Sequence, residues 1–178
     1  VALFGYDLAD RLVKTVQTAS QPDYDASYTT GDPDLSGYVA DSSIVDGDVI
    51  SEQFYDAAGN LVKSIDARGS VSYTVYDALN RPTRTVQNAK ASATLDLHVD
   101  DTGYLATNDP RSAEYVPGTA PDEDLISETV YDAMGRVLTS QRLLENRGAS
   151  TVWDTTHFVY DELGRQKRMI QHFILQGT

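Results

Sequence analysis

A short Tyr-Asp motif recurs five times along the chain and constrains its fold more than any other feature. The copies begin at Tyr6, Tyr55, Tyr76, Tyr131 and Tyr160. Each continues with two variable residues, then Gly, Asn or Asp, and then Arg or Asn. Copied units of this kind are typical of repeat architectures, in which each unit packs on its neighbours. We therefore interpret the whole of 1–178 as a single repeat array.

Each motif has the composition of a tight turn. Asp is favoured at the first position of a type I turn because its carboxylate accepts hydrogen bonds from nearby backbone N–H groups. Gly, Asn and Asp best tolerate the positive φ expected at the fourth position, which Asp10 fills in the first copy. The residues predicted to have a structural role in the repeat are Tyr6, Asp7, Arg11, Tyr55, Asp56, Gly59, Tyr76, Asp77, Asn80, Arg81, Tyr131, Asp132, Gly135, Arg136, Tyr160, Asp161, Gly164 and Arg165.

The residues on either side of each turn favour β-strands. Aromatic and β-branched residues precede the turns, and runs such as LVKTV and LVKSI follow them. Each copy is therefore predicted to be a β-hairpin. The string DARG at 66–69 repeats the turn chemistry between two hairpins. The predicted fold is all-β: an antiparallel meander of hairpins that forms part of a long coiled sheet, the wall of a shell or filament.

Two acidic segments interrupt the array. Residues 18–51 hold seven Asp and no Lys or Arg, whereas 88–126 hold eight acidic residues against Lys90 and Arg111. Together they account for the net charge of −13. Successive connections of a meander fall at opposite ends of its strands. We therefore expect both segments to be long loop insertions at the end away from the Tyr-Asp turns.

This charge distribution excludes several classes of partner. A nucleic-acid binder needs a basic footprint, and anionic membrane surfaces repel an acidic chain. The sequence has no apolar run long enough to cross a bilayer, so no membrane insertion is expected. It has no cysteine, which excludes a disulfide framework. Because it opens with Val in mid-motif, we interpret it as a segment of a longer chain.

The motif resembles the RHS, or YD, repeat family. The likeness is close at Tyr131-Asp132-Gly135-Arg136 and at the corresponding residues from Tyr160. The string DARGSVSYTVYDALNR at 66–81 is similar to the family's full inter-repeat pattern. The chain departs from that pattern with Asp10 and Asn80 where Gly is usual, and with Asn60 where Arg is usual.

The resemblance implies a secreted or cell-surface protein, of bacterial type, whose repeats form a β-sheet that spirals into a hollow shell. In the family's polymorphic-toxin members the shell encloses a toxic segment, and other members, including teneurin-like proteins, serve adhesion or carbohydrate binding. Toxin shells cleave themselves at a DPxGL-type motif by an aspartate mechanism. Here Asp32-Pro33 and Asp109-Pro110 lack the following x-Gly-Leu. We therefore predict no catalytic residue.

Two acidic strings are candidates for metal binding. Asp96, His98 and Asp100 alternate with apolar residues, so they would share one face of a strand and could hold a metal ion. An ordinary half-buried strand explains the same alternation and is favoured. The string DPDLSG at 32–37 opens like a calcium loop, but Ser43 stands where the bidentate Glu should be, so a solvated turn is expected. We predict no metal and no cofactor.

Tyr and Arg recur together and could bind sugars, as stacked aromatic rings often do. The structural alternative is favoured: each Tyr packs on its counterparts in adjacent hairpins, and each Arg bonds the Asp of its own turn. Trp153, the single Trp, is expected to anchor a connection.

These observations predict a structural, non-enzymatic segment that builds an extracellular wall by β-strand pairing. Its expected partners are other copies of itself or the rest of a longer repeat chain, joined through edge strands. Two alternatives stay open: a glycan- or partner-binding adhesion module, and the container segment of a toxin-delivery protein.

Overall fold

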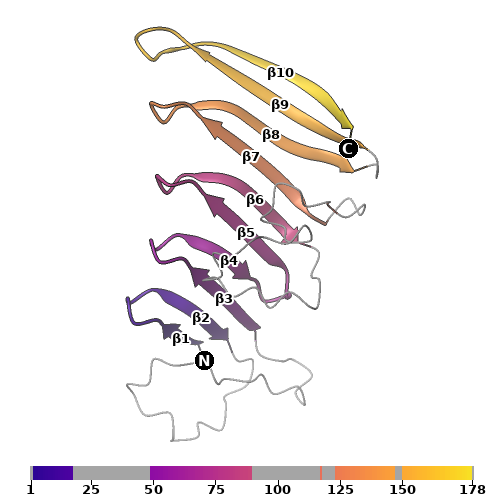
Figure 1. The fold of residues 1–178 in the computed structure, drawn as a ribbon. Coiled ribbons are helices and arrows are strands. Elements are labelled where there is room, and N and C mark those ends of the chain that lie inside the picture. Colours follow the sequence, from indigo (N-terminus) through magenta and orange to yellow (C-terminus); the bar gives the residue numbers. More distant parts are fainter. Residues whose placement is uncertain (1, 18–48, 90–116, 118–122, 147–149, 178) are drawn as a thin grey trace, which may run out of the picture.

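The computed structural model describes residues 2–17, 49–89, 117, 123–146 and 150–177. These residues form one open sheet of ten antiparallel strands that pair in sequence order (Figure 1). Among them there is no helix that could span a membrane. The predicted all-β meander is confirmed. The strands are β1 (Ala2–Tyr6), β2 (Leu12–Gln17), β3 (Val49–Tyr55), β4 (Leu61–Ile65), β5 (Val71–Tyr76), β6 (Pro82–Ala89), β7 (Leu125–Tyr131), β8 (Val137–Asn146), β9 (Ser150–Tyr160) and β10 (Gln166–Gly177).

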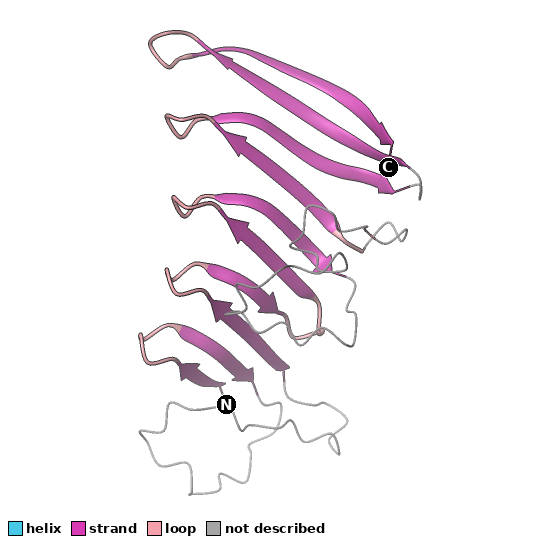
Figure 2. Ribbon diagram, in the orientation of Figure 1, coloured by secondary structure: helices cyan, strands magenta, loops and turns pink. Residues whose placement is uncertain are grey.

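The five Tyr-Asp turns join the strands in pairs, β1 to β2 through β9 to β10. All five turns lie at the same end of the strands, while the other connections leave from the opposite end (Figure 2). The strand pairing shifts register next to each turn, for example between Val130 and Tyr131. Such a shift is expected for a three-residue loop in which a residue with positive φ completes a type I turn. This alternation of ends matches the sequence-based expectation.

The buried residues form a row across one face of the sheet. Tyr73 lies opposite Val86, and Val86 lies opposite Ile126 on the next strand. Leu143 lies opposite Trp153 further along the same row. Ile126 is completely buried and belongs to one core cluster with Tyr73, Val86 and Trp153. The core therefore runs perpendicular to the strands and links β5, β6, β7 and β9.

Trp153 differs from the sequence-based expectation. It does not anchor a connection but lies within β9, in the core cluster. The interval between Tyr131 and Tyr160 is longer than a bare hairpin because β8 and β9 are long strands, of 10 and 11 residues. Its additional residues therefore extend the sheet and its core.

The two predicted insertions lie mostly outside the described residues. The last three residues of the segment 18–51 belong to β3. In the segment 88–126, the first two residues belong to β6 and the last two to β7. The strings 32–37 and 96–100, considered above for metal binding, are outside the described residues, as are both Asp-Pro pairs. Among the described residues, no cluster of His, Cys, Asp and Glu could hold a metal ion.

Candidate functional site

The turn between β7 and β8 shows how the repeat residues act. The carbonyl of Asp132 accepts from the N–H of Gly135 at 3.0 Å, and its own N–H donates to the carbonyl of Arg136 at 2.8 Å. The Asp132 carboxylate accepts from the N–H groups of Met134 and Arg136, both at 2.9 Å. Four backbone N–H groups of the chain reversal thus have a partner close by in sequence. The same two backbone bonds close the other four Tyr-Asp turns and the DARG turn.

The fourth residue of every turn adopts positive φ, as predicted. The values are 63° at Asp10, 89° at Gly59, 58° at Asn80, 82° at Gly135 and 77° at Gly164. Gly reaches this region without steric cost, and Asn and Asp do so more easily than other residues. The two copies that depart from Gly therefore keep the turn geometry.

In four of the five Tyr-Asp turns the fifth residue is Arg, and it binds the Asp that opens the turn, as predicted. The guanidinium Nε of Arg136 lies 2.6 Å from the Asp132 carboxylate, and Arg11, Arg81 and Arg165 make the same contact in their turns. In the second copy the Asn60 amide replaces Arg and donates to the Asp56 carboxylate at 2.9 Å. The Asp carboxylate thus fixes the orientation of the Arg or Asn side chain at the fifth turn position.

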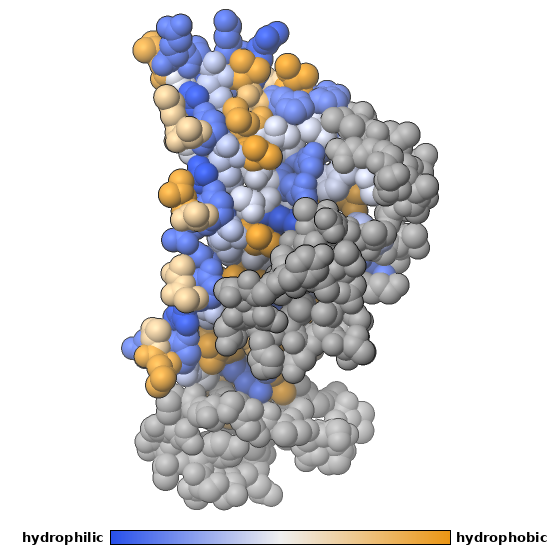
Figure 3. Space-filling view, in the orientation of Figure 1, coloured by the Kyte–Doolittle hydropathy of each residue, from blue (hydrophilic) through white to orange (hydrophobic). Residues whose placement is uncertain are grey.

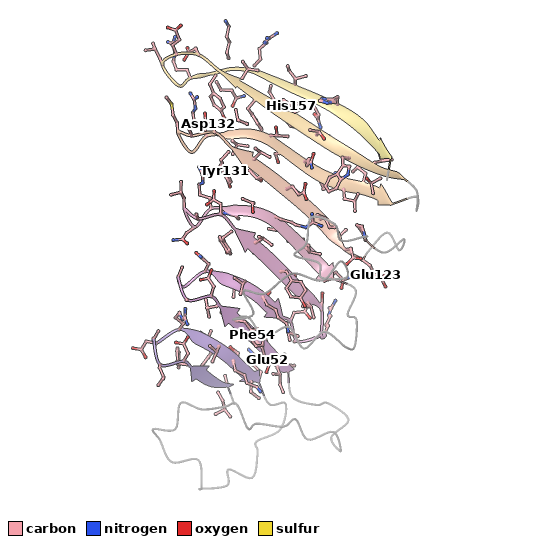
Figure 4. All side chains as sticks on the ribbon, viewed as in Figure 1. Glu52, Phe54, Glu123, Tyr131, Asp132 and His157 are labelled. Carbon is pink, nitrogen blue, oxygen red and sulfur yellow. The ribbon has the colours of Figure 1, made fainter. Side chains whose placement is uncertain are left out.

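Three of these Arg side chains also cover the Tyr of the following hairpin. The guanidinium carbon lies 4.5 Å from the ring centre for Arg81 over Tyr131 and 4.7 Å for Arg11 over Tyr55. Arg136 covers Tyr160 in the same way, at 4.5 Å. A guanidinium at this distance from an aromatic face is attracted by the ring quadrupole. We call this series of Asp–Arg–Tyr contacts the turn ladder; Figure 4 labels two of its members, Tyr131 and Asp132.

The Tyr hydroxyl groups tie each hairpin to the one before it. The hydroxyl of Tyr160 donates to the carbonyl of Val137 at 2.8 Å, and that of Tyr131 donates to the carbonyl of Pro82 at 3.0 Å. Tyr55 and Tyr76 make equivalent bonds. The prediction that Tyr packs on its counterparts is therefore wrong. Hairpins are two strands apart, about 10 Å, so a Tyr contacts the longer Arg side chain between them.

The two departures at Asn60 and Asn80 belong to one contact. The Asn60 amide donates to the side-chain oxygen of Asn80 in the next turn at 2.9 Å. Elsewhere the corresponding pair is Arg and Gly: a Cβ added at Gly135 would lie 3.5 Å from the Nη1 atom of Arg81. The fifth residue of one turn thus faces the fourth residue of the next. Where the fifth residue is a long Arg, the facing fourth residue is Gly. Where it is the shorter Asn60, the facing residue is Asn80, and the two side-chain amides bond each other.

The turn carboxylates are held in their ionised form. The backbone N–H of Arg136 is the largest influence that lowers the pKa of Asp132; partial burial opposes it and the Arg136 guanidinium adds to it. For Asp77 the side-chain hydrogen bond from Arg81 is the largest influence, and its pKa is lowered as well. The pKa of Asp161 is also lowered, mainly by the backbone N–H of Arg165 and then by its guanidinium, with a small addition from Arg136 of the preceding turn. Hydrogen bonds to a carboxylate favour its charged form.

We expect acid to weaken the turns. A pKa that is lower in the folded than in the unfolded chain stabilises the fold fully above about pH 4, near the unfolded value. That contribution is lost as the pH falls through the lowered pKa values. The melting temperature, followed by circular dichroism from about pH 6 to about pH 2, should therefore drop, and should drop less steeply in the Asp132→Asn variant. Equal steepness in both proteins would contradict this account.

Contacts along the ladder should contribute to stability beyond the local Asp–Arg pair. We expect Arg81→Ala to lower the free energy of unfolding by about 1 kcal/mol through loss of the contact with Tyr131. Arg165→Ala is the matched control, because Arg165 also binds its own Asp but covers no ring among the described residues. In urea denaturation, Arg81→Ala should have a lower free energy of unfolding than Arg165→Ala. The opposite order would show that the Arg81–Tyr131 contact does not stabilise the fold.

Sequence analysis missed a second set of charged contacts on the face that carries the core. Arg84 binds Glu128 directly opposite on the next strand, and Gln141 donates to the same carboxylate at 2.6 Å. Lys14 and Glu52 form the equivalent pair at 3.1 Å. The sequence carries a regular spacing that indicates these pairs. In both, the basic residue lies three positions after the fifth turn residue, and the acidic residue lies three positions before the Tyr of the next hairpin.

The turn tips carry exposed apolar side chains. Leu8, Leu79, Met134 and Leu163 all lie between the Asp and the fourth residue of their turns and are largely exposed. Figure 3 shows the resulting apolar groups spaced along the turn end of the sheet.

Comparison with known proteins gives a family match over part of the chain and a distant likeness to a solved structure. A family model described as RHS Repeat matches residues 55–93, which include two Tyr-Asp turns and the DARG turn. No curated protein sequence matches the chain. A solved structure of a Photorhabdus luminescens Tc holotoxin pore is similar over 93% of this chain, with 11% identity and a TM-score of 0.33. The chain spans 7% of the length of that protein. The family model thus bears out the resemblance to the RHS repeat family over residues 55–93.

Proposed function

We propose that the chain is a structural, non-enzymatic segment that builds the wall of an extracellular shell or filament by β-strand pairing. The observation that carries the proposal is the open sheet itself. Its outer strands, β1 and β10, each pair on one side only among the described residues. The open side of a strand presents unpaired N–H and C=O groups, which natural proteins cover or pair. β10 is the longest strand, at 12 residues, so it offers a long template for a further strand.

The chemistry of the ladder supports a structural role. Every carboxyl group with a shifted pKa among the described residues opens a Tyr-Asp turn, and every shift is downward. A general acid needs the opposite shift, so that it keeps a proton near neutral pH. The shifts instead fit carboxylates that serve as hydrogen-bond acceptors. The resemblance to RHS repeat proteins, which are generally secreted or displayed on the cell surface, supports an extracellular location.

The ladder is poorly suited to sugar binding. Tyr55, Tyr131 and Tyr160 each have a guanidinium over the ring. A sugar that stacked on that side would have to displace the Arg from both the ring and its Asp partner. Glycan binding elsewhere on the chain and the role of a toxin container stay predictions.

Electron microscopy of the native particle that contains this chain tests the proposal. We expect density for further strands about 4.8 Å from β1 and from β10, continuous with the sheet. Amide hydrogen exchange adds a second readout: protons at 169–175 should exchange slowly in the particle. A particle in which both outer strands face water, with fast exchange at 169–175, would overturn the wall and favour a self-contained binding module.

A further inference from the structure

The four junctions between hairpins differ in the length of their connections. The DARG turn joins β4 to β5, and the short segment 147–149 joins β8 to β9. The segments 18–48 and 90–124 join β2 to β3 and β6 to β7, and we call these two the long-connected junctions. A tight connection fixes which residues of two antiparallel strands lie opposite each other. A chain of about 30 residues can reach about 100 Å, so the length of the two long segments imposes no register.

One pair of positions distinguishes the two kinds of junction. In every junction the residue three positions after the fifth turn residue lies opposite the residue three positions before the next Tyr. In chain order these pairs are Lys14–Glu52, Lys63–Tyr73, Arg84–Glu128 and Thr139–His157. Figure 4 labels Glu52 and His157. The first and third pairs are ion pairs and lie at the long-connected junctions. The second and fourth lie at the short ones and combine no opposite charges.

The two ion pairs are partly shielded from water. The side chain of Arg84 is 9% exposed, and that of Lys14 is 12% exposed. Taking two charges out of water costs about as much free energy as their attraction returns, so a shielded ion pair adds little net stability. Separating its partners is costly, because each charge then lacks compensation. Such a pair therefore selects one alignment of two strands over the alternatives more than it stabilises the sheet.

The alternatives to the observed register are shifts by two residues. A shift by one would turn every side chain of a strand to the other face of the sheet, whereas a shift by two keeps the faces. At the β6–β7 junction a shift by two in one direction would place Glu128 opposite Val86. In the other direction it would place Arg84 opposite Ile126. Either shift thus separates the charges and sets one of them against an apolar side chain of the core.

We propose that the ion pairs Lys14–Glu52 and Arg84–Glu128 select the register of the two long-connected junctions. The ladder depends on this selection, because the offset that joins Arg84 to Glu128 also brings Arg81 to Tyr131. At the short junctions the connection itself fixes the offset, so no ion pair is needed at these positions. Register selection by these pairs goes beyond the proposed function and is independent of whether the sheet builds a wall.

Cysteine cross-linking in the full chain tests this role, because the chain has no cysteine of its own. Thr85 lies opposite Ser127, so Thr85→Cys with Ser127→Cys reports the native register. Thr85→Cys with Thr129→Cys reports a shift by two residues. With oxidised glutathione, the native reporter should cross-link at least about tenfold faster than the shifted one, since only Cβ atoms of opposite residues lie close to disulfide distance.

Replacing an ion pair with apolar residues should release the register. In Arg84→Met with Glu128→Leu, we expect the shifted reporter to cross-link at least about tenfold faster than in the parent chain, because no charge is then left against an apolar side chain. Circular dichroism should show that the β-sheet is kept. Lys14→Met with Glu52→Leu should release the β2–β3 junction in the same way.

The β8–β9 junction provides the matched control. Thr139→Val with His157→Leu changes the equivalent positions, but the short segment 147–149 still fixes the register. The native reporter there is Ser140→Cys with Thr156→Cys, which lie opposite each other. It should cross-link as fast in this variant as in the parent chain.

Charge exchange separates register selection from stability. Arg84→Glu places two carboxylates opposite each other in the native register and should speed the shifted reporter by at least about tenfold. Adding Glu128→Arg should restore the parent pattern. A parent pattern in both the apolar variant and Arg84→Glu overturns the proposal. An apolar variant that loses the β-sheet while the exchanged variant keeps it also overturns it, because the pair would then stabilise the sheet instead of selecting its register.

Discussion

Replacing Ile126 with alanine will lower the free energy of unfolding by about 2–5 kcal/mol. Ile126 is completely buried at the centre of the core row, where Val86 lies opposite on the adjacent strand. The smaller side chain loses the transfer free energy of three carbon atoms and leaves a cavity that a sheet of fixed register fills poorly. Trp153 is the single Trp of the chain and belongs to the same cluster, so its fluorescence will report the urea transition.

Val130 is the matched control for this prediction. It lies on the same strand as Ile126 and, four residues later, on the same face, but it is 55% exposed. Val130→Ala should therefore change the free energy of unfolding by less than about 1 kcal/mol. If the two variants lose stability equally, the buried row is not the core of the sheet.

Replacing Gly135 with valine will destabilise the protein by about 1–3 kcal/mol. The residue has φ of 82°, a conformation that a β-branched side chain adopts only with strain. A Cβ at this position would already contact Arg81, so the additional methyl groups also disturb the ladder. Thermal melting followed by circular dichroism measures the loss.

The chain supplies its own control at this turn position. Asn80 occupies the same position with φ of 58°, so Gly135→Asn should keep the turn and cost much less than Gly135→Val. A valine variant that melts with the parent protein would show that the turn does not constrain φ.

The turns could be predicted from sequence because their chemistry is local. The hydrogen bonds that close a turn form within five residues, as between Asp132, Gly135 and Arg136. The role of each residue follows from its type. The meander follows from hairpins of this kind joined one after another, as at the DARG turn. Local composition thus determined the fold class and the position of every Tyr-Asp turn.

The contacts between hairpins could not be predicted in this way, because they depend on register. Arg81 and Tyr131 are 50 residues apart in sequence and meet only because β6 and β7 pair at one particular offset. The same offset pairs Arg84 with Glu128. Likewise, the lone Trp153 gives no periodic signal, and it reaches the core only because β8 and β9 are longer than the repeat requires.

The unequal strand lengths have a geometric consequence. β4 has 5 residues and β10 has 12, which correspond to about 17 Å and about 40 Å of extended chain. All five Tyr-Asp turns remain aligned, so the sheet widens only at its other border (Figure 1). The position of a hairpin in the stack therefore sets the local width of any wall built from it.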